Sequence, residues 1–237
     1  QAGCKMGCSF CASTKNGCAR NLTASEILSE VYTAEKDTGV RVSNIVLMGI
    51  GEPLDNYDNV IKFIRLISHP EGKNISVRNI TLSTCGIVPG IYKLIEENLP
   101  ITLSVSLHAP NDEKRSEIMP VNKKWGVKEV VRAAKDYYEK TGRRVSFEYA
   151  LVKGVNDSKS DADELSSLLK GLNCHINLIP VNEIEKSGHK APDKEHVRRF
   201  TEYLSEKGLN VTVRRTLGAD INASCGQLRA SAIKEVE

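Results

Sequence analysis

Three cysteines lie close together near the beginning of the sequence. Cys4, Cys8 and Cys11 follow the spacing C-x3-C-x2-C in a loop that also contains Gly3 and Gly7. Thiolates this close in sequence can converge on one soft metal centre, because a loop rich in small residues can fold around it. Three ligands are one short of a closed tetrahedral site. A cubane iron–sulfur cluster held this way has one iron free to bind another molecule, so the loop predicts a metal site with an open position.

Small and polar residues directly follow the predicted strands farther along the chain. These residues are Gly51, Glu52, Ser83, Ser106, Leu107, His108 and Asn182. In parallel α/β folds the loops at the carboxyl ends of the strands carry the chemistry, so we expect these residues to face one site. The carboxylate of Glu52 can accept hydrogen bonds from an ammonium, and Ser83 and Asn182 can bind hydroxyls or a carboxylate. The set suits a zwitterionic, amino-acid-like ligand that carries a nucleoside.

Each of these residues also has a purely structural interpretation. Ser83 can satisfy backbone groups at the end of its strand, and His108 can stabilise the turn that it begins. Glu52 can cap the helix that follows it. Their joint position at successive strand ends favours the interpretation as a binding site.

Short apolar segments alternate with amphipathic ones along the chain. Strands are predicted at residues 45–48, 79–83, 101–107, 145–152, 176–179 and 211–214, with helices between them at 87–97, 113–119, 127–141, 161–170 and 194–207. Two earlier helices are predicted, one between a capping box at Thr23 and Glu26 and a terminating Gly39, and one that contains Phe63. This alternation predicts an α/β fold of parallel βαβ units, in a partial, open TIM-like β/α barrel. We expect residues 1–237 to form a single domain.

The composition is that of an ordinary globular protein. Of the 237 residues, 40% are hydrophobic and 27% are charged, and no apolar run approaches the roughly 20 residues of a transmembrane helix. With no secretory signal, the seven cysteines indicate reduced cytosolic thiols, not a disulfide framework. Because a metal-binding loop usually follows a strand, we expect a further strand and an additional region before Gln1.

These motifs together resemble those of radical S-adenosylmethionine (SAM) enzymes. More narrowly, the chain resembles the RlmN family of RNA adenine-C2 methyltransferases. The similarity extends over the cysteine loop and residues 20–23, 48–53, 106–112, 154–157, 177–182 and 225–228. The C-x3-C-x2-C spacing alone marks only the superfamily, whereas the later motifs indicate this branch and its Cfr-type relative, which methylates C8 of adenine.

The resemblance implies a cofactor pair and a set of site residues. Cys4, Cys8 and Cys11 would hold a [4Fe–4S] cluster whose fourth iron is chelated by the amino and carboxylate groups of SAM. The strand-end residues named above would bind SAM, and Cys225 would be the cysteine that is S-methylated during turnover. A disulfide bond is expected on the same grounds. The implied reaction is methylation of C2 of adenine in 23S rRNA and tRNA, through a methyl-cysteine intermediate and a 5′-deoxyadenosyl radical.

The resemblance also implies partners and a location. An electron donor such as flavodoxin or ferredoxin would reduce the cluster, and a cytoplasmic monomer is expected. Lys123, Lys124, Arg214 and Arg215 are candidates for contacts with RNA phosphates. The family's second cysteine, its proposed base and its RNA-binding region correspond to positions before Gln1. We therefore expect the chain alone to bind the cofactors but to turn over poorly.

Three alternatives remain open from the sequence. The first is C8 methylation of adenine by a Cfr-type enzyme. The second is a glycyl-radical activase, which has a similar cluster motif but gives no reason for Cys225. The third is a zinc-binding interaction module that uses the loop cysteines with Cys18 as a fourth ligand. Cys85 and Cys174 are predicted to be small core residues, and Cys18 is predicted to lie in a loop.

Overall fold

The computed structural model describes residues 1–181 and 188–214 of the chain. Its main sheet has six strands that all pair in parallel, each with its neighbour in sequence. They are β3 (Ile45–Leu47), β4 (Ile80–Thr84), β5 (Thr102–Ser106), β6 (Val145–Leu151), β7 (Cys174–Pro180) and β8 (Val211–Val213). Within the described residues β3 and β8 do not pair, so the sheet stays open. The predicted partial barrel is confirmed.

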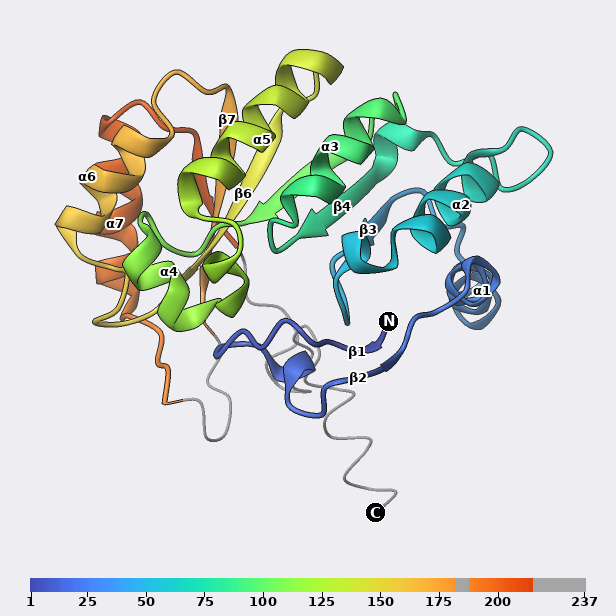
Figure 1. Ribbon diagram of the computed structural model, residues 1–237, viewed down its shortest axis with the longest axis horizontal. Helices are drawn as coiled ribbons and strands as arrows, with labels where there is room; N and C mark the ends of the chain where they lie inside the picture. The colour runs from blue at the N-terminus through green and yellow to red at the C-terminus, as the bar shows by residue number, and fades with distance from the viewer. Residues whose placement is uncertain (182–187, 215–237) are drawn as a thin grey trace.

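Seven α-helices lie in the described part of the chain. They are α1 (Ala24–Thr38), α2 (Tyr57–Ser68), α3 (Val88–Glu96), α4 (Asp112–Ile118), α5 (Val127–Thr141), α6 (Lys159–Leu168) and α7 (Lys194–Glu206). Most of these helices form an arc along the outer face of the sheet, whereas the N-terminal segment lies on the inner side (Figure 1). No helix in the described part of the chain is long and apolar enough to cross a membrane.

The ends of α1 show why the predicted helix signals were correct. The Thr23 side chain accepts from the backbone N–H of Glu26, and the Glu26 side chain accepts in return from the backbone N–H of Thr23. Gly39 ends the helix in the left-handed region, at φ 67°, where its N–H bonds to Glu35. Both ends are therefore set by local hydrogen bonding.

The two faces of the sheet differ in polarity because successive side chains in a strand point to opposite faces. Leu103 and Val105 of β5 are fully buried in the apolar core with the helices. Ser104 and Ser106 alternate with them and lie beside Glu148 of β6, which pairs in register with Ser106. The inner face therefore carries buried polar side chains, whereas the opposite face packs against the helices.

A short hairpin at the N-terminus was not predicted. β1 (Ala2–Gly3) and β2 (Cys18–Arg20) pair antiparallel, and the cysteine loop lies between them. Cys18 therefore lies in a strand, and the prediction that it occupies a loop was wrong. Four 3-10 helices complete the described elements: η1 (Ala12–Thr14), η2 (Pro53–Asn56), η3 (Val77–Asn79) and η4 (Pro120–Lys123).

Candidate functional site

The cysteine loop is docked against the carboxyl ends of β4 and β5. The backbone N–H of Ser9 donates to the carbonyl of Ile118 at 3.0 Å. The ring of Phe10 meets that of His108 edge-on, with centroids 4.7 Å apart. The Cys8 side chain belongs to a small buried apolar cluster with Cys85 and the end of α4. In the structure, the cysteine loop therefore lies against the strand ends that carry the predicted binding residues.

Burial makes Cys4 and Cys8 poor anions. Desolvation raises the pKa of Cys4, and it raises the pKa of Cys8 to about 12. The charges of Cys4 and Cys11 add to the shift at Cys8, so these thiol groups lie close enough to repel one another as thiolates. A bound cation removes both penalties, because metal binding releases the thiol protons and neutralises the charge. The site is therefore arranged for a metal centre.

Three soft thiolates on one loop can serve an iron–sulfur cluster or a zinc ion. A structural zinc site would need a fourth protein ligand, whereas three protein thiolates on a cubane cluster would leave one iron open.

All six described cysteines are free thiols. The expected disulfide bond is therefore not formed among the described residues. Cys85 and Cys174 are buried in apolar surroundings, as predicted for small core residues.

Glu52 is the most deeply placed acid near the loop. Its carboxylate accepts hydrogen bonds from the backbone N–H of Leu54 at 3.0 Å and of Cys85 at 2.7 Å. It therefore caps the 3-10 helix η2, as its structural interpretation predicted, and also ties the end of β3 to the end of β4. Burial raises the pKa of the Glu52 carboxyl despite these bonds. The side chains of Cys85 and Thr84 also donate to this carboxylate.

Gly51 has a backbone conformation and a close neighbour that disfavour any residue with a side chain. Its φ is +98°, and a Cβ there would lie 2.7 Å from the side chain of Gln1. The Gln1 carboxamide in turn accepts from the backbone N–H of Glu52 at 2.7 Å. Glycine at this position therefore allows the loop to lie directly against the side chain of Gln1.

The remaining predicted residues differ in what they still offer a ligand. Ser83 is buried at the end of β4 and Ser106 is partly exposed, and neither hydroxyl has a hydrogen-bond partner among the described residues. Leu107 is fully buried, its N–H donates to Glu148 and its carbonyl accepts from Arg115. The two serines thus keep free polar groups, whereas Leu107 shapes the loop.

His108 combines an unusual backbone with a defined tautomer. Its φ is +59°, in the left-handed region that few non-glycine residues adopt. The ring Nδ1 accepts from the backbone N–H of Ala150 at 2.8 Å, so the proton of the neutral ring is on Nε2. Burial, with the nearby Arg115 cation, lowers the pKa of His108 to about 3. His108 is therefore a neutral N–H donor as well as a turn-stabilising residue.

Sequence reasoning missed several polar residues at the site. Glu148 is buried on the inner face, where its oxygens accept from Ser104 Oγ and Asn177 Nδ2, each at 2.8 Å, and burial raises its pKa. The alternation of polar and apolar residues in the strands at 102–106 and 145–151 could have revealed Glu148. Arg115 lies fully buried in α4, and no local pattern marks it.

The other predicted residues lie outside the described residues or on the surface of the protein. Asn182, Arg215 and Cys225 lie outside the described residues. Lys123 and Lys124 are exposed around the end of η4, and Lys124 lies over the ring of Trp125. Arg214 is exposed directly after β8. These three cations can meet phosphates without rearrangement of the core.

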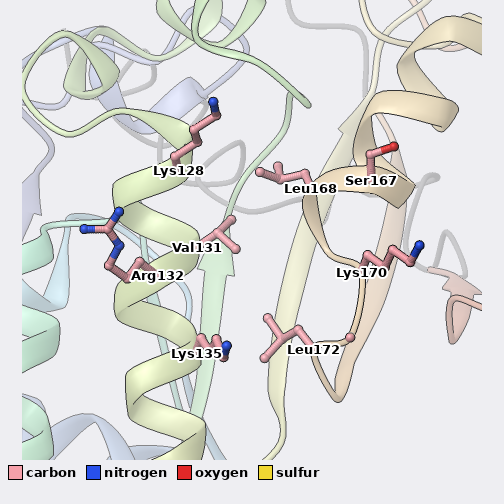
Figure 2. Close-up of a pocket in the computed structure, with 9 residues that line it drawn as sticks. Lys128, Val131, Arg132, Lys135, Ser167, Leu168, Lys170 and Leu172 are labelled. Atoms are coloured by element: carbon pink, nitrogen blue, oxygen red, sulfur yellow. The ribbon is translucent and has the colours of Figure 1, made fainter.

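A separate shallow groove lies between α5 and the segment that joins α6 to β7 (Figure 2). Its volume is about 540 Å³, and Val131, Leu168 and Leu172 form its apolar part. Its cationic lining residues are Lys128, Arg132, Lys135 and Lys170. None of the predicted site residues lines it, so it is a basic surface feature distinct from the strand-end site.

The chain is similar to known proteins over its whole length. The model of the radical SAM superfamily matches residues 1–166. A curated protein of Lachnoclostridium phytofermentans, named "Probable dual-specificity RNA methyltransferase RlmN", is 58% identical over 231 residues, which are 98% of this chain and 65% of that protein. A protein of the same name from Clostridium botulinum is 57% identical over 237 residues, 100% of this chain and 68% of the relative. The chain thus spans about two thirds of the length of these relatives.

Solved structures agree with this assignment. A radical SAM methyltransferase from Sphaerobacter thermophilus has a TM-score of 0.91 and 45% identity, covering 97% of this chain and 68% of that one. A domain of a pyruvate-formate lyase-activating enzyme from Bacteroides vulgatus has a TM-score of 0.55 and 14% identity, covering 73% of this chain and 100% of that domain. The second likeness shows the shared fold alone, so the activase alternative gains no support. The chain belongs to the radical SAM superfamily and, within it, to the RlmN family of RNA methyltransferases.

Proposed function

We propose that residues 1–237 are a single catalytic domain that methylates C2 of adenine in RNA. Membership of the family implies a [4Fe–4S] cluster and SAM as cofactors. The observation that carries the proposal is the docking of the cysteine loop onto the strand ends through Phe10–His108 and Ser9–Ile118. It places three thiol-bearing residues beside a strand edge that offers hydroxyls, an imidazole and a carboxylate.

Cys4, Cys8 and Cys11 would hold the cluster. The fit rests on two observations in the described chain: the three thiols share one loop that lies against the strand ends, and burial opposes the free anionic form of Cys4 and Cys8. Three protein thiolates leave one iron without a protein ligand, as cofactor binding at that iron requires. When bound, the cluster and SAM supply the methyl group and the radical chemistry that an electron-poor carbon such as C2 needs.

The strand-end residues would bind and orient SAM. The Glu52 carboxylate is the acid that would face the ammonium group of SAM. The free hydroxyls of Ser83 and Ser106 suit a carboxylate or the ribose, and the Nε2–H of His108 can donate to the nucleoside. Gly51 allows the backbone to approach closely, and Leu107 fixes the loop. We also assign SAM binding to Asn182 and the role of methyl acceptor to Cys225, on the motifs that contain them.

RNA would be the macromolecular substrate. The relatives' name describes dual-specificity RNA methyltransferases, and 23S rRNA and tRNA are the substrates that we propose. The target adenine must leave its stack to expose C2, so a loop in structured RNA is expected. Lys123, Arg214 and the basic groove between α5 and α6 offer phosphate contacts. A cytoplasmic monomer reduced by flavodoxin or ferredoxin completes the proposal.

Anaerobic reconstitution tests the proposal directly. The protein should bind about four irons and turn brown, Cys8→Ala should lose both features, and Cys174→Ala should keep them because that thiol lies in the core on β7. With SAM and dithionite we expect 5′-deoxyadenosine and an S-methyl group on Cys225, detected by mass spectrometry. Stoichiometric zinc without iron would refute the proposal. A methyl group at C8 of adenine, not C2, would identify the Cfr-type reaction.

A further inference from the structure

Arg115 is a fully buried arginine at the centre of the site. Its guanidinium donates five hydrogen bonds, all to neutral oxygens. The acceptors are the carbonyls of Leu107 (2.9 Å), Trp125 (3.4 Å), Cys85 (2.7 Å) and Ser106 (3.0 Å) and the side-chain oxygen of Asn122 (3.0 Å). It therefore clamps the ends of β4 and β5 to η4 and the turn after it.

This cation has no counter-ion in the described part of the chain. Arg115 makes no ion pair there. The Asp112 carboxylate favours the charged form of Arg115 but makes no ion pair with it, and its Oδ1 accepts from the N–H groups of Asn122 and Val127. Burial of a charge without an ion-pair partner is unfavourable, and the carbonyl dipoles and Asp112 offset only part of the penalty. The imbalance indicates that an anion belongs nearby.

The buried surroundings of Arg115 identify where that anion would lie. Arg115 bonds to the carbonyl of Cys85, and the Cys85 side chain packs in the same buried cluster as Cys8. On the other side of Cys85, its N–H donates to Glu52. Arg115 therefore lies behind the loop that we assign to the cluster, on the protein side of the site.

We propose that Arg115 is a positioning residue that supplies the counter-charge for a thiolate-bound cluster and fixes the strand ends that receive SAM. The inference rests on the proposed function, because it assumes a cluster at Cys4, Cys8 and Cys11. A cluster held by three thiolates has a net negative charge, and one-electron reduction adds another. A fixed positive charge in a low-dielectric interior favours the reduced form. Arg115 therefore raises the reduction potential of the cluster and keeps the SAM loops in place.

Two substitutions separate charge from hydrogen bonding. Arg115→Gln removes the charge, whereas Arg115→Lys keeps the charge but has only three donors, on one nitrogen. Arg143→Gln is a matched control, because Arg143 also binds strand-end oxygens, Thr102 Oγ1 and the Arg78 carbonyl, but at the amino ends of the strands. Each reconstituted variant is assayed for iron content, for midpoint potential by EPR-monitored redox titration, and for SAM affinity.

We expect R115Q to bind the cluster with a more negative midpoint potential. At a fixed solution potential near the wild-type midpoint, its ratio of reduced to oxidised cluster should fall by about tenfold, a change that corresponds to about 59 mV for one electron. R115K should keep a potential near that of the wild type but bind SAM more weakly, because the strand-end carbonyls lose donors. R143Q should match the wild type in both measurements.

The outcomes distinguish the two proposals. A wild-type protein without iron refutes the cluster assignment itself. A wild-type protein with a full cluster, together with an R115Q protein whose potential is unchanged, overturns only the role of Arg115. If R115Q does not fold, the midpoint potential of R115K is used instead. A potential equal to that of the wild type supports the role of Arg115 as a counter-charge. A clearly more negative potential contradicts that role, because lysine keeps the charge.

Discussion

Asn156 holds the turn after β6 against the candidate site. Its side chain is fully buried and makes three hydrogen bonds, each 2.7 Å long. Nδ2 donates to the carbonyls of His108 and Ala150, and Oδ1 accepts from the backbone N–H of Val152. Asn156→Ala would leave one N–H and two carbonyls without these partners in the protein interior. We therefore expect a large loss of stability.

The magnitude follows from the number of orphaned groups. A buried polar group that loses its partner costs about 1–3 kcal/mol. Taking a value near the low end for each of the three groups gives about 3–5 kcal/mol for N156A. Because a domain has a total stability of about 5–15 kcal/mol, this loss is a large part of the whole. Urea unfolding followed by circular dichroism measures it, as a shift of the midpoint at constant slope.

A surface asparagine provides the control. Asn173 is exposed, and its side chain donates one long bond of 3.3 Å to the hydroxyl of Tyr138. Asn173→Ala should change the stability by no more than about 0.5 kcal/mol. An N156A protein as stable as N173A would refute the reasoning, since it would mean that the orphaned groups find other partners at no penalty. SAM affinity should fall in N156A as well, because Asn156 holds the carbonyl of His108.

Three further predictions follow from the site and its surroundings. Burial lowers the pKa of folded His108 from 6.5 to about 3, so below about pH 6.5 the unfolded chain binds a proton that the folded protein does not bind. As the pH falls from about 6.5 toward 3, the free energy of unfolding therefore decreases by up to about 1.4 kcal/mol per pH unit. In His108→Asn, urea unfolding between these pH values should show a shallower dependence, and an identical profile would contradict the burial of a neutral ring. Gly51→Ala should cost about 1–2 kcal/mol because of its positive φ and weaken SAM binding, whereas Gly49→Ala, with open space around its Cβ, should change neither. In the groove, Lys128→Glu combined with Lys170→Glu should weaken RNA binding and reduce its logarithmic salt slope by about 1–2; an unchanged slope in a filter-binding titration would show that RNA does not contact this surface.

Regular elements were predictable where local signals agreed with packing. The bounds predicted for residues 127–141 are those of α5, because an apolar face runs the whole length and Gly142 ends the helix at φ 65°. Strand positions were correct within a few residues because buried parallel strands form short apolar runs. Their order then followed from the right-handed βαβ rule. The placement of Glu52 at a strand end needed nothing more than this topology.

Features that depend on distant partners were not predictable. The hairpin of β1 and β2 is too short for any periodicity and is fixed by a bond between Cys4 N–H and the Gly17 carbonyl at 2.8 Å. Arg115 stands in a short, highly charged helix, a pattern that is typical of a solvent-facing surface. Its burial arises only when carbonyls from β4, β5 and the turn after η4 converge on one point. Tertiary structure, not local sequence, decides both.

The N-terminal hairpin has a consequence for how a cofactor enters. Gly3 and Gly17 bring the two ends of the cysteine loop together, so closely that a Cβ on Gly3 would lie 2.0 Å from the Gly17 carbonyl oxygen. The Thr14 hydroxyl also donates to the carbonyls of Cys8 and Cys11. These contacts restrict the conformations of the loop, so chain folding bears part of the entropy loss that cluster binding would otherwise bear. Cluster binding to such a loop is correspondingly tighter, and removal of the iron should leave the barrel folded.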